Sequence, residues 1–435
     1  MEDAHDVKIG LKYGLKDWSY FAVFDGHAGK RAAAFAAWNL LEFILRDSQL
    51  KLQTKDLPGH VPIEPELEKD TKKNMIVEHR YRPGSSEQKL STESEPSQCD
   101  SQASSEKSMK ETTDTKQSDP SDVLTIQTEK NVSSENTVPK PELISLPVKE
   151  QLISVKEAIR SGFLRIDESM RVADDLSGCT AICVLISPTH LFIANCGDSR
   201  AVLFDGVTPT FATEDHKPLN PKERQRIINA GGFVSQRING TLAVSRALGD
   251  FEFKKDNHRG PCEQLVSPEP EVTVIDRGEK DEFLVLACDG IWDVMENNEL
   301  CEFIQYRLRV DPSVQNVCSS VIDLCLHRGS RDNMSIIIVV FENGPKFSEE
   351  FRSEEEKSDK ALAELARSLS EQSNDWVDFI DRLRDTIEVE KNDPKISAIR
   401  LPPGGGLEAK YDMLLKIFEE ENMKSEASPQ EATNH

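Results

Sequence analysis

Short apolar segments rich in β-branched and aromatic residues follow one another along this 435-residue chain, with few helical segments between them. Each has the length of a strand and ends at polar or turn-forming residues, as buried β-strands do. The segments are WSYFAVF (18–24), TAICVLIS (180–187), HLFIANC (190–196), RAVLF (200–204), EVTVID (271–276), EFLVLAC (282–288) and SIIIVVF (335–341). Because strands follow strands directly, we predict an α+β fold with antiparallel sheets and not a doubly wound parallel sheet.

Amphipathic helices are predicted next to these strands, because apolar residues recur there three and four positions apart. The first has Phe35, Trp38, Leu41 and Ile44 at this spacing. The predicted helices span residues 30–45, 155–172, 299–308 and 313–328. Their occurrence in pairs fits helical layers packed against the sheets.

A long polar segment, at about residues 48–146, interrupts this pattern and is rich in Ser, Thr, Glu, Lys, Gln and Pro. No aromatic residue occurs between Tyr81 and Phe163. Such a composition cannot bury enough apolar area to compensate for chain entropy, so we expect a disordered insert. A solvated spacer is the simpler role for it, and phosphoregulation is the alternative.

The chain becomes acidic after Phe341 and carries further amphipathic helical patterns, with a Pro-Pro-Gly break before the last of them. These patterns span residues 361–372, 375–389 and 408–421. We therefore predict a domain over residues 1–341, interrupted by the insert, and an acidic C-terminal helical region over residues 342–435.

The formal net charge of −24 argues against nucleic acid or an anionic membrane as the main partner. No signal peptide pattern opens the chain, and no apolar run approaches the roughly 20 residues that cross a bilayer. Most of the cysteines lie in apolar segments and none forms a Cys-x-x-Cys pair. We therefore expect buried free thiols in a soluble intracellular protein, located in the cytoplasm with the nucleus left open.

Acidic residues recur where predicted strands end or where a loop meets a strand. The set comprises Glu2, Asp3, Asp25, Asp198, Asp289, Asp293 and Asp332. Any one of them fits ordinary turn chemistry. Together, however, carboxylates at strand ends converge on one edge of a sheet, where raised pKa values or bound cations must relieve their repulsion. Oxygen ligands without cysteine or paired histidines favour Mg²⁺ or Mn²⁺ over Zn²⁺.

Such a centre would suit hydrolysis. Two ions bridged by a carboxylate can lower the pKa of a bridging water and produce a hydroxide nucleophile. His27, two residues after Asp25, would then lie beside the ions as a general acid for a leaving oxygen. Taken alone, His27 fits a solvent-facing helix residue equally well. The spacing indicates metal-assisted hydrolysis without naming the substrate.

Many separate motifs, in order, resemble those of the PPM-type (type 2C) metal-dependent protein serine/threonine phosphatases. They include MEDAH (1–5), FAVFDGHAG (21–29), SGCTA (177–181), NCGDSRAVL (195–203), NGTLAVSRALGD (239–250), LACDGIWDV (286–294) and GSRDNMS (329–335). The likeness covers about residues 1–341 apart from the insert. It is strongest to the animal alpha and beta isoforms, which carry a C-terminal helical domain.

This resemblance implies a β-sandwich of two antiparallel sheets flanked by helix pairs (α-β-β-α), with a dinuclear metal site at one end. It assigns roles at the metals to Glu2, Asp3, Asp25, Gly26, Asp198, Asp289, Asp293 and Asp332. Asp25 would bridge two ions, while Asp198 and Asp293 match residues of a weaker third site. His27 matches the proposed general acid, and residues 213–268 match a flap that influences substrate choice.

Two features depart from the family pattern. Family members have one or two strands before MEDAH, with an arginine that binds substrate phosphate four residues before the glutamate. We therefore expect an N-terminally truncated chain that lacks the first strand or strands and binds substrate less tightly by about 1.5–3 kcal/mol. The close relatives also lack the insert.

The resemblance implies a monomeric enzyme that hydrolyses phosphoserine and phosphothreonine in phosphoproteins. Metal-bound hydroxide at two or three Mg²⁺ or Mn²⁺ ions would attack phosphorus. The missing arginine leaves an alternative open, a catalytically weak phosphoprotein-binding or scaffold protein. A hydrolase of small phosphoesters is a third possibility.

Overall fold

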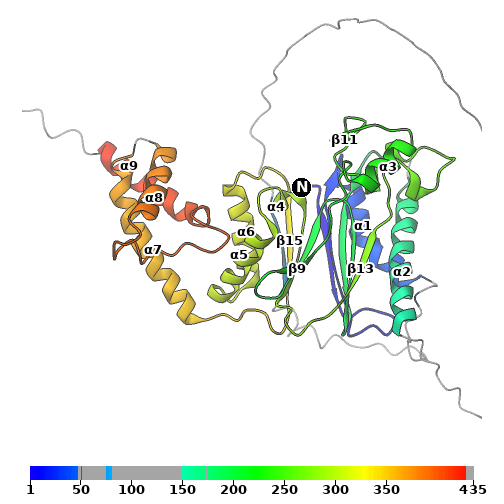
Figure 1. The fold of residues 1–435 in the computed structure, drawn as a ribbon, viewed down its shortest axis with the longest axis horizontal. Helices are drawn as coiled ribbons and strands as arrows, with labels where there is room; N and C mark the ends of the chain where they lie inside the picture. The colour runs from blue at the N-terminus through cyan, green and yellow to red at the C-terminus, as the bar shows by residue number, and fades with distance from the viewer. Residues whose placement is uncertain (48–49, 51–74, 81–147, 172–174, 374, 428–435) are drawn as a thin grey trace, which may run out of the picture. The chain divides into compact units, whose positions relative to one another are not determined.

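The computed structural model describes residues 1–47, 50, 75–80, 148–171, 175–373 and 375–427. Its main strands are β1 (Ala4–Ile9), β2 (Ser19–Phe24), β4 (Met75–Arg80), β6 (Ala181–Ile186), β7 (His190–Cys196), β8 (Arg200–Phe204), β9 (Pro209–Ala212), β13 (Glu271–Asp276), β14 (Phe283–Ala287) and β15 (Met334–Val340). They form two five-stranded sheets, in the orders β1-β2-β6-β7-β13 and β4-β15-β14-β8-β9 (Figure 1). Every neighbouring pair in them is antiparallel, as predicted.

Alternate residues of the central strands pack into different cores, because successive side chains of a strand point to opposite faces. In β2, Tyr20 and Phe24 belong to a core on the helical side of the sheet. Phe21 and Val23 instead share a core with Leu286 of β14, between the two sheets. Burial on both faces explains why these strands are almost continuously apolar in the sequence.

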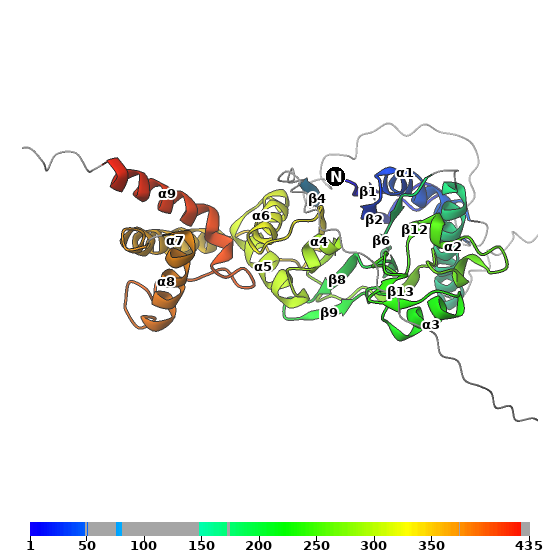
Figure 2. The same ribbon diagram turned by 90° about the horizontal axis from the view of Figure 1, so that it is seen from above.

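Helix pairs cover the outer faces of the two sheets (Figure 2). Helices α1 (Arg31–Leu45) and α2 (Val148–Met170) share a core with the first sheet. Helices α5 (Asn297–Val310) and α6 (Val314–His327) share a core with the second. The predicted α-β-β-α sandwich is therefore confirmed.

One strand occurs where we predicted a disordered insert, so that prediction is wrong for Met75–Arg80. This segment is β4, which pairs antiparallel with β15 and places Arg80 opposite Met334. Its Met-Ile-Val start favours a strand, and β15 would otherwise be a sheet edge with unpaired backbone groups. With β4 and Leu50 excepted, the predicted insert lies outside the described residues.

The predicted flap, residues 213–268, has a small apolar core of its own. It contains α3 (Pro221–Asn229) and the hairpin of β10 (Val234–Ser235) and β11 (Arg237–Ile238). Strand β12 (Leu248–Gly249), at its far end, joins a small sheet of order β12-β5-β3. The partners are β5 (Gly178–Cys179) and β3 (Gly26–His27), so the flap is tied to the residues that follow Asp25.

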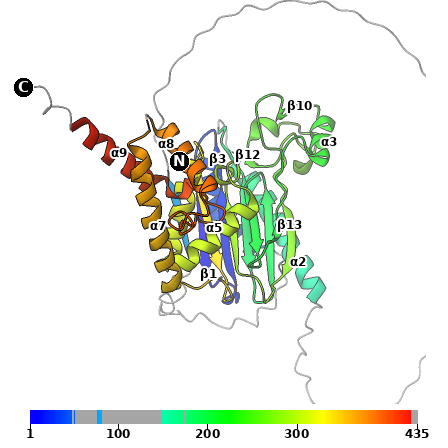
Figure 3. The ribbon, with the colours of Figure 1, turned by 60° about the vertical axis from the view of Figure 1, so that its left-hand side comes forward.

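The C-terminal region contains α7 (Glu349–Ser370), α8 (Trp376–Val389) and α9 (Tyr411–Ala427) (Figure 3). Their shared core includes Phe379 and Phe418, whose ring centroids lie 5.1 Å apart. Helix α7 begins earlier than predicted because its polar first half contacts α5, where Arg307 pairs with Glu355 at 3.0 Å.

Eight of the cysteines lie in the described part of the chain, and all eight are free thiols. Seven are buried, as predicted; Cys262 is partly exposed. Within the same residues, we find no helix with the length and apolar character needed to span a membrane.

Substituting Gly162 with alanine tests the close packing of α1 against α2. A Cβ atom at Gly162 would lie 2.6 Å from Cγ1 of Ile44 and 3.2 Å from its backbone. Alanine favours a helix over glycine by about 1 kcal/mol, but overpacking costs about 1–3 kcal/mol. We expect Gly162→Ala to lower the free energy of unfolding by up to about 2 kcal/mol, measured with urea.

The matched control is the same substitution in an Ile44→Ala background, where the added destabilisation should disappear. A more stable Gly162→Ala protein would contradict this packing.

Candidate metal centre

Asp25 lies between β2 and β3 and is half-buried. Its backbone carbonyl accepts a hydrogen bond of 2.9 Å from the N–H of Thr180. Burial raises the pKa of the Asp25 carboxyl well above its usual 3.8, and the negative charges of Asp289, Asp3 and Asp198 raise it further. The ends of several strands therefore bring their carboxylates close to Asp25.

Asp289 follows β14 and opens the short helix α4 (Asp289–Trp292). Burial raises the pKa of its carboxyl from 3.8 to about 7, and the charges of Asp198 and Asp293 contribute in the same direction. A hydrogen bond with Asp25 opposes this shift. Asp289 and Asp25 therefore share a site in which two negative charges are unfavourable.

Two glycines let backbone segments pass one another at this end of the sandwich. A Cβ atom at Gly26 would lie 2.3 Å from the carbonyl oxygen of Glu2, and one at Gly290 would lie 2.2 Å from that of Asn333. No other residue type fits at either point without moving the neighbouring backbone. The first contact brings Glu2 next to the Asp25 turn, and the second brings the loop of Asp332 next to α4.

Asp3 is held by Ser335 of β15, whose hydroxyl donates a hydrogen bond of 2.7 Å to Oδ2. Burial raises the pKa of the Asp3 carboxyl, while hydrogen bonds from Ser335 and Cys288 partly reverse the shift. Its other oxygen, Oδ1, is buried and has no hydrogen-bond partner. A buried carboxylate oxygen without a partner is unfavourable and points to a ligand or water at this position.

The remaining predicted ligands differ in exposure. Asp198, in the turn between β7 and β8, is buried and accepts a hydrogen bond from the ammonium of Lys217. Burial raises the pKa of the Asp198 carboxyl, although Lys217 opposes the shift. Asp293 and Asp332 are exposed, and Glu2 is half-buried. The charges of Asp293 and Asp332 both act on Asp289, so the structure brings the predicted set to one end of the sandwich.

His27 has a partner that the sequence analysis missed. Its Nε2 lies 2.7 Å from Oδ2 of Asp250, whose side chain is only 4 % exposed. Burial lowers the pKa of His27, but the hydrogen bond and charge of Asp250 outweigh it, and the net shift is upward. Asp250 is the last residue of the motif NGTLAVSRALGD, so the family resemblance could have identified it. Its pairing with His27 could not be predicted, because 223 residues separate the two in the chain.

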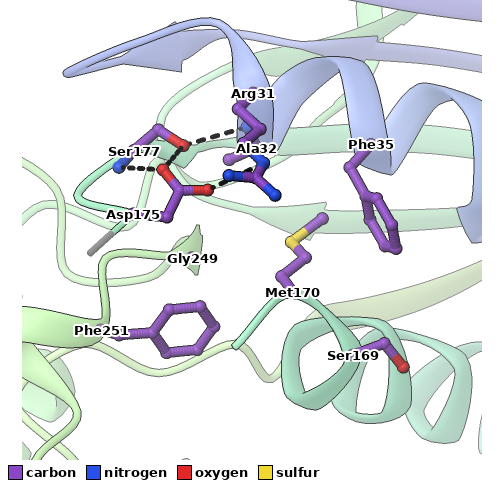
Figure 4. Close-up of a pocket in the computed structure, with 9 residues that line it drawn as sticks. All are labelled: Arg31, Ala32, Phe35, Ser169, Met170, Asp175, Ser177, Gly249 and Phe251. Atoms are coloured by element: carbon purple, nitrogen blue, oxygen red, sulfur yellow. Dashed lines mark hydrogen bonds and ion pairs between the residues drawn. The ribbon is translucent and has the colours of Figure 1, made fainter. Parts of the chain in front are cut away.

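A pocket lies between the start of α1 and the end of α2, and its lining includes Gly249, the residue before Asp250 (Figure 4). In it, the hydroxyl of Ser177 accepts a hydrogen bond of 3.1 Å from the N–H of Ala32 and donates one of 2.8 Å to Asp175. The guanidinium of Arg31 pairs with the same carboxylate at 3.5 Å. These contacts fix the start of α1, four residues after His27.

The fit of this site to metal ions rests on charge. No group of three His, Cys, Asp or Glu side chains among the described residues is arranged as a ready-made metal site. The charges of Asp3, Asp198 and Asp289 nevertheless raise the pKa of Asp25, the charge of Asp198 also raises the pKa of Asp289, and Oδ1 of Asp3 has no hydrogen-bond partner. Hard oxygen donors that repel one another in a buried site suit a divalent cation such as Mg²⁺ or Mn²⁺.

Comparisons with known proteins agree with this site. The family described as Protein phosphatase 2C matches residues 84–334, and the Protein serine/threonine phosphatase 2C, C-terminal domain, matches residues 335–419. Human Protein phosphatase 1B is 39% identical over 98% of this chain and 71% of its own length. Rat Protein phosphatase 1B is 39% identical (96% of this chain, 85% of that protein), and bovine Protein phosphatase 1A is 38% identical (96% and 86%). The chain therefore belongs to the protein phosphatase 2C family of metal-dependent protein serine/threonine phosphatases.

Proposed function

We propose that this chain hydrolyses phosphoserine and phosphothreonine in proteins at a centre of two Mg²⁺ or Mn²⁺ ions, with a third ion held more weakly. The observation that carries the proposal is the convergence of Asp3, Asp25, Asp198 and Asp289 at one end of the sandwich, where Asp198 is buried, the other three are half-buried and the pKa of each carboxyl is raised. Membership of the family supports the reaction class and the substrate class.

Asp25 would bridge two ions, because it lies among the other carboxylates and interacts with most of them. Glu2 would hold one ion and Asp289 with Asp332 the other, while Asp198 and Asp293 would serve the weaker site. Asp3, fixed by Ser335, would orient water through its unpartnered oxygen. When bound, such ions supply the Lewis acidity that activates water and stabilises negative charge on a phosphoryl group.

His27 would donate the proton that the departing serine or threonine oxygen needs. Its Nε2 faces Asp250, so Nδ1 is the nitrogen for proton transfer. The raised pKa of His27 favours the protonated imidazole required of a general acid near neutral pH. Asp250 would orient the ring and stabilise its charge.

The alternative, a phosphoprotein-binding or scaffold protein with little turnover, makes a different prediction. Such a protein would bind a phosphopeptide but release no phosphate from it at millimolar Mn²⁺. A malachite-green phosphate assay combined with isothermal titration of the same peptide separates the two functions.

Asp25→Asn should reduce phosphate release from a phosphothreonine peptide by more than about 100-fold, because the neutral amide removes a bridging charge worth several kcal/mol in the transition state. The matched control is Asp276→Asn, the same change at an exposed residue at the other end of β13 from the site. The control should keep wild-type rates. Near-wild-type turnover in Asp25→Asn would exclude the metal assignment.

The stability of the metal-free protein should fall between pH 4 and 7 because of Asp289. The folded state keeps the Asp289 proton until about pH 7, while the unfolded state loses it near 3.8. The folded state thus binds more protons in this window, and the free energy of unfolding decreases as pH rises, by up to about 1.4 kcal/mol per pH unit. Urea unfolding in EDTA should show a flatter pH profile for Asp289→Asn; identical profiles would contradict the raised pKa.

Asp250→Asn should lower kcat for a phosphothreonine peptide by about 10- to 100-fold, because it weakens a general acid whose contribution is typically 10²–10⁴-fold. The effect on p-nitrophenyl phosphate should be much smaller, since nitrophenolate leaves without protonation. Equal losses with both substrates would show that Asp250 acts on something other than proton donation.

A further inference from the structure

Arg328 joins three segments that are far apart in the sequence. It caps the C-terminal end of α6, and its side chain is only 18% exposed. One guanidinium nitrogen, Nη1, donates to Oε2 of Glu299 at 3.0 Å and to the carbonyl of Val294 at 3.3 Å. The other, Nη2, donates to the carbonyl of Gly404 at 2.9 Å.

One of these contacts, and the position of Arg328 in the chain, lead to the metal centre. Val294 is the residue after Asp293, in the loop that leaves α4. Arg328 itself is four residues before Asp332, and between them the hydroxyl of Ser330 donates a hydrogen bond of 2.7 Å to the carbonyl of Gly290. The side chain of Arg328 therefore braces the Asp293 loop, and the hydroxyl of Ser330, two residues further on, ties the Asp332 loop to α4.

The same guanidinium also supports the start of α5. Oε2 of Glu299 accepts the N–H of Glu296 at 3.2 Å, which caps this helix, and it accepts Arg328 as well. A charge-assisted contact to an arginine holds this carboxylate more firmly than a neutral hydrogen bond does. The loop between α4 and α5 is thus fixed at both of its ends.

The third segment, Pro402–Gly406, belongs to the C-terminal region. Gly404 has a φ of +65°, and a Cβ atom there would lie 1.9 Å from the carbonyl oxygen of Glu299. The segment therefore rests directly on the start of α5 and presents its carbonyl to Arg328. Any side chain at Gly404 would push the segment off α5 and break that contact.

We propose that Arg328 is a positioning residue through which the C-terminal segment Pro402–Gly406 holds the loops of Asp289, Asp293 and Asp332 in the arrangement that binds divalent cations. This inference rests on the proposed function, because it concerns the same metal centre. It assigns the C-terminal region a part in metal affinity, transmitted by the hydrogen bonds of Arg328 to Val294, Glu299 and Gly404.

Gly404→Ala and Arg328→Lys test the proposal in the full-length protein. Lysine keeps the charge but has no planar fork to bridge three segments. The matched control is Gly406→Ala. Gly406 has a backbone conformation similar to that of Gly404 (φ +55°), but a Cβ atom there would meet only the flexible side chain of Glu408. The readouts are the Kd for Mn²⁺ from isothermal titration, Tm in EDTA, and kcat with a phosphothreonine peptide.

We expect both test variants to bind Mn²⁺ about tenfold more weakly, as is usual when residues supporting metal ligands are changed, and Gly406→Ala to stay within about twofold of wild type. A lower Tm with an unchanged Kd in both variants would overturn the proposal, since Arg328 would then be structural only. So would a weaker Kd in Arg328→Lys alone, because the C-terminal segment would then play no part. Wild-type protein that binds Mn²⁺ but releases no phosphate would contradict the proposed function and leave this inference intact.

Discussion

The burial of both faces of the central strands determines where this fold can place charge. Alternate side chains of β2 and β14 fill either the core between the sheets or the core beneath the helices, so neither strand has a face for a carboxylate. Acidic residues are compatible with such strands only where the strands end. Asp25 is the first residue after β2, Asp289 the second after β14, and Asp198 lies in the turn after β7. The place of the site is thus a consequence of the sandwich.

Among the described residues, the fully buried carboxylates each pair with a basic side chain, whereas Asp25 and Asp289 do not; the buried ones are Asp167, Asp198, Glu223 and Asp250. Glu223, although buried, has its pKa lowered to about 2, because Arg246 and Arg226 outweigh the cost of burial. The pKa of Asp25 moves in the opposite direction, and among the described residues neither Asp25 nor Asp289 forms an ion pair. Two arginines thus compensate the charge of Glu223, and no arginine or lysine pairs with Asp25 or Asp289 among the described residues. Under the proposed function, a cation from solution would supply the charge that compensates this pair, and the protein without the ion would be less stable for lack of it.

The sequence could predict elements whose signal is local, and it could not predict contacts between distant segments. Apolar strands such as β2 and β14 and the helix α1 were predicted because burial on one or both faces leaves a pattern in the residues themselves. Strand β1, AHDVKI, was not predicted, because it is only half-buried and lacks that pattern. Asp25 was found from its strand-end position. Asp250 was missed as the partner of His27, because nothing in either local sequence indicates that 223 residues of chain fold back to join them.

Close backbone contacts hold the segments that carry these acidic residues in place. At Gly26, Gly290 and Gly404 one backbone passes another so tightly that a Cβ atom would collide, and each contact joins segments that lie far apart in the chain. The first secures the N-terminal segment with Glu2, the second secures the loop of Asp332 against α4, and the third secures the C-terminal region against α5. Ligand loops at a sandwich end have few side chains of their own to hold them. Contacts with neighbouring segments hold them instead, and the contact at Gly404 comes from the C-terminal region, outside the two sheets.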